Sequence, residues 1–173
     1  VITVRKEDIR EKVRARRSGV TVMFLVDASG SMGAARRMGA VKGAILSMLT
    51  DAYERRDSVG MVAFRGKEAF TLLNITKSPA LAARCLRGLK TGGRSPLAAG
   101  LLKAAELLRQ EKIKHPDALQ YLAVVTDGRA NVPLYPDGSS EKDVRSAAEL
   151  IRKSGIISAV LDTEAGFIRT GGG

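Results

Sequence analysis

The sequence predicts an α/β fold of three layers: a mostly parallel central sheet with one antiparallel edge strand, and helices on both faces. Short apolar runs rich in β-branched residues, typical of buried strands, alternate with segments whose apolar residues recur every three or four positions. The second and third apolar runs are only a few residues apart, which leaves no room for a crossover helix. The chain of 173 residues is 45% hydrophobic and 27% charged, as expected for one folded domain.

The first half of the chain predicts three strands and one helix. Residues 20–26 (Val-Thr-Val-Met-Phe-Leu-Val) are almost wholly apolar and therefore predict a central parallel strand. Residues 35–55 predict a helix with one buried stripe. That stripe consists of Met38, Val41, Ile45, Met48, Leu49 and Ala52. Residues 58–64 and 69–74 follow as an antiparallel hairpin.

The second half continues the alternation of helices and strands. Helices are predicted at residues 78–89, 96–111 and 141–154, and strands at residues 119–126 and 156–161. Ser78 is a suitable N-cap followed by Pro79, and Gly155 fits the position just after a helix. The proline- and glycine-rich residues 128–140 predict a surface loop.

The chain is strongly basic and carries a single cysteine. It has 29 Lys and Arg residues against 18 Asp and Glu residues, a formal net charge of +11, which indicates an acidic partner. The basic residues are densest in residues 1–18, which we expect to precede a domain at residues 19–173. Elsewhere they are spread along the chain, a pattern that does not favour nucleic acid. No apolar run is long enough to span a membrane, and Cys85 alone forms no intrachain disulfide.

Carboxylates and hydroxyls follow the predicted strands at the points where these end. Asp27, Ser29 and Ser31 come directly after the first strand, and Asp127 follows the strand at 119–126. Ser95 precedes a predicted helix and belongs on the same edge of the sheet. Ligand sites of open α/β sheets lie beyond the carboxyl ends of the strands. Hard oxygen ligands without His or Cys suit Mg²⁺ or Mn²⁺, so the sequence predicts a divalent metal site there.

Each catalytic role that these residues could have requires a further residue that the sequence does not supply. Ser29-Gly-Ser-Met-Gly33 resembles a degenerate nucleophile elbow, but the chain has one histidine, His115, which precedes a strand and so belongs on the opposite edge. An aspartyl-phosphate phosphatase needs a carboxylate where Ser29 stands. A phosphate-binding P-loop needs a lysine, which Gly93-Arg-Ser95 lacks. We therefore expect no catalytic residues in this chain.

Three motifs together resemble the metal-ion-dependent adhesion site of von Willebrand factor A domains, also called integrin I domains. They are Asp27-Ala-Ser-Gly-Ser31, Gly92-Gly-Arg-Ser-Pro-Leu97 and Thr126-Asp-Gly-Arg-Ala-Asn131. Further segments resemble the C-terminal domain of the magnesium chelatase D subunit and its cobalt-chelatase relatives. These segments are residues 8–14, 60–66, 127–133 and 162–164.

The resemblance implies a role for each residue of the site. Ser29 and Ser31 are implied as direct ligands of Mg²⁺ or Mn²⁺, and Asp27 and Asp127 as ligands that act directly or through water. Ser95 stands where the family usually has threonine, so it keeps the hydroxyl but lacks the methyl group that restricts the rotamer. Arg94 and Arg129 flank these ligands, and we expect them to guide a partner carboxylate to the ion.

The function implied is that of a metal-ion-dependent protein interaction module, itself non-catalytic, in an ATP-dependent magnesium or cobalt chelatase that inserts metal into a tetrapyrrole. The implied partners are an AAA+ ATPase subunit and other chelatase subunits, reached through an acidic side chain. The implied location is the cytoplasm, or the plastid stroma in a plant. The alternative is a von Willebrand factor A binding module outside chelatases, including an RNA-binding type, whose affinity would fall steeply with salt but not with loss of the divalent ion.

Overall fold

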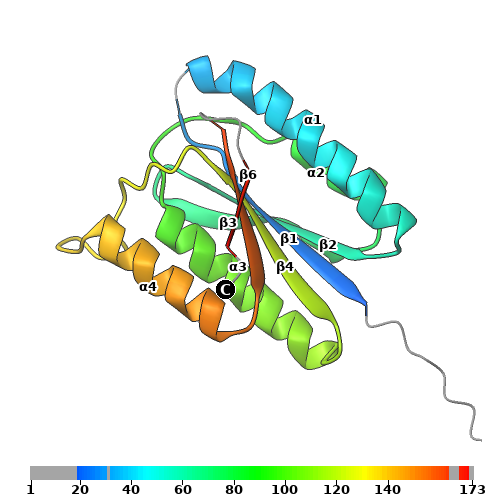
Figure 1. Ribbon diagram of the computed structural model, residues 1–173. Coiled ribbons are helices and arrows are strands. Elements are labelled where there is room, and N and C mark those ends of the chain that lie inside the picture. The colour runs from blue at the N-terminus through cyan, green and yellow to red at the C-terminus, as the bar shows by residue number, and fades with distance from the viewer. Residues whose placement is uncertain (1–18, 31, 164–167, 172–173) are drawn as a thin grey trace, which may run out of the picture.

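The computed structural model describes residues 19–30, 32–163 and 168–171 (Figure 1). The basic segment 1–18 and Ser31 lie outside the described residues. The strands of the described part are β1 (Val20–Asp27), β2 (Ser58–Arg65), β3 (Glu68–Thr76), β4 (Leu119–Thr126), β5 (Ile157–Asp162) and β6 (Ile168–Gly171). The helices there are α1 (Met32–Glu54), α2 (Pro79–Arg87), α3 (Leu97–Lys114) and α4 (Ser140–Lys153).

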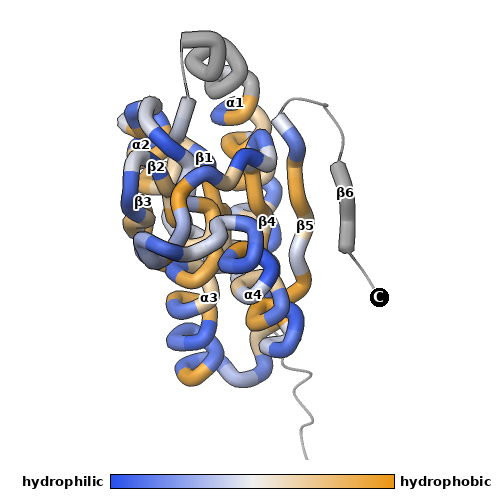
Figure 2. Tube along the Cα trace, turned by 90° about the vertical axis from the view of Figure 1, so that its left-hand side faces the viewer, coloured by the Kyte–Doolittle hydropathy of each residue, from blue (hydrophilic) through white to orange (hydrophobic). Residues whose placement is uncertain are grey.

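The described strands form one sheet in the order β3-β2-β1-β4-β5-β6. β1 lies in the middle and pairs in parallel with both β2 and β4, and β5 pairs in parallel with β4. β3 pairs antiparallel with β2, as the short connection between them predicted. The mostly parallel α/β fold is confirmed. β6 pairs antiparallel with β5 at the other edge of the sheet and adds a second antiparallel edge strand that was not predicted. Figure 2 shows β5 beside β4.

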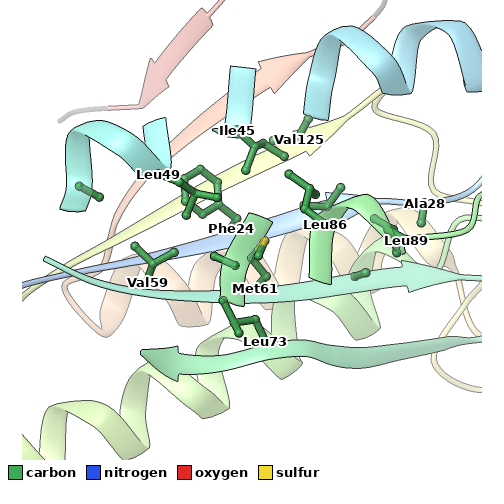
Figure 3. Close-up of a cluster of buried hydrophobic side chains, with 14 residues drawn as sticks. Phe24, Ala28, Ile45, Leu49, Val59, Met61, Leu73, Leu86, Leu89 and Val125 are labelled. Carbon is green, nitrogen blue, oxygen red and sulfur yellow. The ribbon is translucent and has the colours of Figure 1, made fainter. Parts of the chain in front are cut away.

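Helices cover both faces of the sheet, and neighbouring residues of β1 point alternately to these two faces. Phe24 and Val26 pack in a cluster with residues of α1 and α2, such as Ile45 and Leu86 (Figure 3). Met23 belongs to a second cluster that includes residues of α3 and α4. Burial on both faces explains why the sequence of β1 is a continuous apolar run.

The helix ends follow local sequence signals. The Ser78 hydroxyl accepts a hydrogen bond from the backbone N–H of Leu81 at 3.3 Å, which confirms Ser78 as the N-cap of α2. After α4, Gly155 has a φ of 70°, the left-handed conformation expected of a glycine just past a helix end. No helix in the described ranges is long and apolar enough to cross a membrane.

Helix α3 packs closely against β1 and β2 at Gly100. A Cβ atom built on Gly100, in the first half of α3, would lie 2.7 Å from Phe64 Cδ1 and 3.0 Å from Leu25 Cδ1. Only glycine fits this contact without displacement of its neighbours. Because α3 begins at Leu97, this contact also fixes the turn that carries Ser95, directly above the ends of β1 and β2.

Candidate metal site

Asp27 and Thr126 are neighbours at the carboxyl edge, the side of the sheet where the parallel strands end. The register of β1 and β4 pairs Val26 with Val125, so the next residue of each strand stands at this edge. The structure thus brings the motif after β1 beside the motif after β4, as the sequence predicted for Asp27 and Asp127.

The Asp27 carboxylate is buried and accepts three hydrogen bonds. Its Oδ2 accepts from the Ser95 hydroxyl at 2.9 Å and from the Thr126 hydroxyl at 3.0 Å. Its Oδ1 accepts from the backbone N–H of Ser29 at 2.8 Å. Only 9% of Asp27 is exposed, so these donors replace water around a buried charge. They hold the carboxylate in one orientation.

The backbone of Ser95 forms two hydrogen bonds with Asn131, one to its side chain and one to its backbone N–H. The Ser95 N–H donates to the side-chain Oδ1 of Asn131 at 2.8 Å, and the Asn131 N–H donates back to the Ser95 carbonyl at 3.3 Å. The segment with Asn131 is tied to α4, because the Ser140 hydroxyl donates to the Ala130 carbonyl at 2.8 Å. Asn131 therefore links the loop after β4 to the turn before α3.

Two glycines connect the motif after β1 to the turn before α3. The Gly92 N–H donates to the Ala28 carbonyl at 2.8 Å, and the Gly30 N–H donates to the Gly93 carbonyl at 3.1 Å. Gly92 and Gly93 have φ values of +140° and +91°, which side chains rarely tolerate. A Cβ on Gly93 would also lie 3.1 Å from backbone atoms of Gly66. The Gly-Gly pair is thus required by the close approach of these turns.

Asp127 and the two predicted partner-binding arginines lie at the outer rim of the site. The Asp127 Oδ1 accepts from the backbone N–H of Arg129 at 3.0 Å, and its Oδ2 lies 3.7 Å from Arg129 Nε. Because the Arg129 side chain is 67% exposed, this ion pair adds little stability. The Arg94 side chain is exposed, and its backbone carbonyl accepts from Gly66 N–H at 2.8 Å.

Hydrogen bonds connect three of the five predicted ligands directly. Asp27 is hydrogen-bonded to Ser95 through the side chain and to Ser29 through the backbone, and Asp127 follows Thr126 at the same edge. Ser31 lies outside the described residues. Sequence reasoning missed the two supporting residues, Thr126 and the amide of Asn131. Both stood within a recognised motif, but only their side-chain contacts reveal their roles.

The donor chemistry of the site fits a hard dication. Asp27 has about four lone-pair positions, of which three accept hydrogen bonds. The Ser95 hydroxyl donates a hydrogen bond to Asp27, so the lone pairs of its oxygen remain available to a metal ion. The described ranges contain no group of three or more His, Cys, Asp or Glu residues that could hold a metal by themselves, so the predicted site depends on hydroxyl ligands as well as carboxylates. Carboxylates combined with hydroxyls favour Mg²⁺ or Mn²⁺.

A cavity of about 1400 Å³ lies at the opposite edge of the sheet, where the parallel strands begin. It is bordered by the starts of β1, β4 and β5, with Val22, Tyr121 and Ile157 among its lining residues. Carboxylates also stand at its rim, but they form no metal-binding group in the part of the chain that the structure describes.

Comparison with known proteins finds a matching family model and longer relatives. The model of a family described as the von Willebrand factor type A domain matches residues 22–129. An uncharacterized protein of Mycobacterium tuberculosis is 44% identical over 95% of this chain and 26% of its own length. The magnesium-chelatase 67 kDa subunit of Chlorobaculum parvum is 38% identical over 98% of this chain and 29% of its own length. The chain thus spans less than a third of these relatives.

A solved structure shows the same fold at low sequence identity. The manganese-loaded TRAP protein of Plasmodium vivax superposes with a TM-score of 0.65 at 18% identity, over 83% of this chain and 56% of that one. At this identity the likeness establishes the arrangement of strands and helices, and the chemistry of the edge is argued from the residues of this chain.

Proposed function

Because the chain belongs to the von Willebrand factor type A domain family, we propose that it is a divalent-ion-dependent protein interaction module. Its similarity to magnesium-chelatase subunits over nearly its whole length supports a chelatase-related role. We assign it to the D-type subunit of an ATP-dependent magnesium or cobalt chelatase, where it couples subunits and performs no chemistry itself. The activity of the whole complex belongs to other parts of the assembly.

The observation that carries the proposal is the preoriented Asp27 carboxylate. Three donors fix it, and a lone-pair position is left over at the edge where Ser29 and Asp127 also lie. Asp27, Ser29, Ser31, Ser95 and Asp127 are the proposed ligand set. The two carboxylates offset the positive charge of the ion, and the hydroxyls add neutral oxygens. A solved structure with the same fold, the TRAP protein of Plasmodium vivax, is manganese-loaded, which supports a divalent ion in this fold.

The proposed partner group is a carboxylate of another subunit. When bound, the dication supplies a positive charge with a coordination position that an acidic side chain can fill. Arg94 and Arg129 stand at the rim of the site on a domain of net charge +11, so they guide an acidic group inward. An AAA+ ATPase subunit that offers such a group is the proposed partner.

Association with the AAA+ ATPase subunit of the same organism tests the proposal. We expect binding, followed by biolayer interferometry, in Mg²⁺ and its loss both in EDTA and in Asp127→Asn. Combining EDTA with Asp127→Asn should cause no greater loss of binding than either change alone, because both act by removing the bound ion. Asp51→Asn, an exposed change on α1, is the matched control and should bind normally. Full-strength binding in EDTA contradicts the proposal, and salt-sensitive, ion-independent binding to RNA would favour the alternative module.

A further inference from the structure

The cavity at the amino edge, the side of the sheet where the parallel strands begin, has an apolar floor. Its volume of about 1400 Å³ exceeds the about 300–1,000 Å³ of small-molecule sites, so it has room for a segment of polypeptide. The floor is made by residues of β1, β4 and β5. They are Val22, Phe24, Tyr121, Ala123, Ile157 and Ala159.

The floor residues form two rows that cross the three neighbouring strands. The register pairs Val22 with Tyr121, and Tyr121 with Ile157. The next row along the strands is Phe24, Ala123 and Ala159. Phe24 packs in the cluster with residues of α1 and α2, so both rows face the layer formed by these helices (Figure 1).

The cover over these rows decreases from β1 towards β5. Phe24 is 1% exposed, whereas Tyr121 is 36% and Ile157 is 47% exposed. On the other face of β4, Leu122 is 1% exposed in the cluster with residues of α3 and α4. Parallel strands are normally buried on both faces, so the described residues leave the α1 side of β4 and β5 only partly covered.

Residues 1–18 are tethered at the mouth of this cavity, because Ser18 is bonded to Gly19, one of the lining residues. A short tether raises the effective concentration of a segment to about the millimolar range, so modest contacts are enough to hold it. Ile2, Ile9 and Val13 are seven and four positions apart, which is the spacing of one face of a helix. The segment therefore has an apolar stripe that matches the apolar floor.

Charge favours this occupant over a second copy of the chain. Each copy carries a net charge of +11, so two copies repel each other, whereas residues 1–18 have a net charge of only +4. The charged residues at the rim of the cavity are balanced in sign, so they oppose the segment little. They are Asp51, Glu54 and Asp57 against Arg55, Arg56 and Lys77.

We propose that residues 1–18 fold back over the α1 side of β4 and β5 and place Ile9 and Val13 against Tyr121 and Ile157. Removal of these apolar side chains from water stabilises the docked segment, and its basic residues stay in solvent. The docking site lies at the edge of the sheet opposite the candidate metal site, so the inference does not depend on the proposed function.

Cross-linking of the full chain in EDTA tests the position of the segment. In a Cys85→Ala background, Val13→Cys is combined with Ile157→Cys or, as the matched control, with Leu150→Cys. Leu150 is 48% exposed near the end of α4, on the other helical layer. We expect a short bismaleimide to link positions 13 and 157 within one chain at least about tenfold faster than positions 13 and 150, as measured by mass spectrometry. Equal rates would overturn the proposal, and links mainly between chains would overturn it in favour of a second copy.

Thermal unfolding of the full chain tests the apolar contacts. Ile9→Ser combined with Val13→Ser should lower the melting temperature by about 5 °C, because the segment loses its contacts with the sheet. Arg10→Ser combined with Arg14→Ser changes polar positions of the same segment and should not lower it. An unchanged melting temperature in the first variant, or an equal decrease in both, would show that Ile9 and Val13 do not pack on the sheet.

Discussion

Asp27 shows how a charged residue can end a buried strand without destabilising it. A buried carboxylate is costly unless donors replace its water, and here two hydroxyls and one backbone N–H do so. The same donors fix the direction in which the remaining lone pair points. One arrangement therefore serves both stability and the proposed ligand role.

Thr126 should contribute to stability through its hydroxyl. It donates to Asp27 at 3.0 Å and accepts from the Gly128 N–H at 3.1 Å, so Thr126→Val removes one of the three donors to the buried Asp27 carboxylate and takes away the acceptor of the Gly128 N–H. We expect Thr126→Val to lower the free energy of unfolding by about 1–3 kcal/mol in EDTA. Thr126→Ser keeps the hydroxyl and should lose clearly less. Urea denaturation of the two variants checks this, and a loss in Thr126→Ser as large as that in Thr126→Val would contradict a role specific to the hydroxyl.

Asn131 should act on metal affinity through Ser95. Asn131→Ala removes the acceptor for the Ser95 N–H, so the Ser95 hydroxyl is no longer held in place. We expect Mg²⁺ affinity to fall by about tenfold, the lower end of the range for residues that orient ligands. Asn131→Asp retains an acceptor and should bind more tightly than Asn131→Ala. Asn74→Ala, at an exposed position of β3, is the calorimetric control; affinities alike in Asn74→Ala and Asn131→Ala would refute the positioning role.

For individual residues, the sequence indicated the side chains that follow the strands but not the side chains that hold them in place. The location of Asp27 and Ser95 at one edge of the sheet was anticipated from the strand ends and the helix start, and the structure adds a hydrogen bond between them. The contact between Asn131 and Ser95 joins two irregular segments 36 residues apart, and no periodicity predicts such a pair. The position of Asp127 as a ligand stays a prediction.

Among the elements, α3 most directly connects packing to the site. Its glycine lets the helix approach Phe64 and Leu25, and the helix start carries the Ser95 turn. A side chain at Gly100 would push the helix away from β1 and β2 and so disturb the turn above them.

The same substitution should therefore have opposite effects in two helices. Gly100→Ala places a Cβ 2.7 Å from Phe64 and should destabilise the fold by about 1–3 kcal/mol. Gly43→Ala, in α1, meets nothing within 4 Å and should stabilise it by about 0.5–1 kcal/mol through helix propensity. Thermal and urea unfolding of both variants check this; a stabilised Gly100→Ala variant would show that α3 can shift freely.

Strands and helices were largely predictable because their local signals agree with the global fold. The predicted strand at 119–126 has the observed bounds, and the caps at Ser78 and Gly155 were recognised from residue type. β6 was missed because a strand of four residues that ends in glycine is too short to show a period. Its pairing with β5 depends on the neighbouring strand, which a local pattern does not reveal.

For the whole molecule, the core and the site are separate. Two apolar clusters fill the spaces between the sheet and the helices, and the proposed ligands lie at the edge above them. The fold class was predictable because burial on both faces of a parallel sheet leaves a clear alternation in the sequence. The partner that binds at the carboxyl edge depends on side chains in loops. Loops have no periodic pattern from which these side chains could be predicted.

Removal of divalent ions should leave the fold intact. The ion contributes only the linkage term, about 2.7 kcal/mol at a free concentration 100 times its dissociation constant. We expect the melting temperature, followed by circular dichroism, to rise with Mg²⁺ concentration and to return to a constant value in EDTA with a native spectrum. Complete unfolding in EDTA at room temperature would mean that the ion holds the core together.

Calorimetric titration of Mg²⁺ and Mn²⁺ into this chain tests the central claim most directly. We expect binding to one site, lost in Asp27→Asn, strongly weakened in Asp127→Asn, weakened least in Ser95→Ala, and unchanged in the exposed control Asp51→Asn. This order follows because an aspartate provides a charge that offsets the dication, whereas a serine provides one neutral oxygen. Mg²⁺ affinity that is the same in Asp27→Asn and in Asp51→Asn would contradict the assignment of a divalent-ion site to the carboxyl edge.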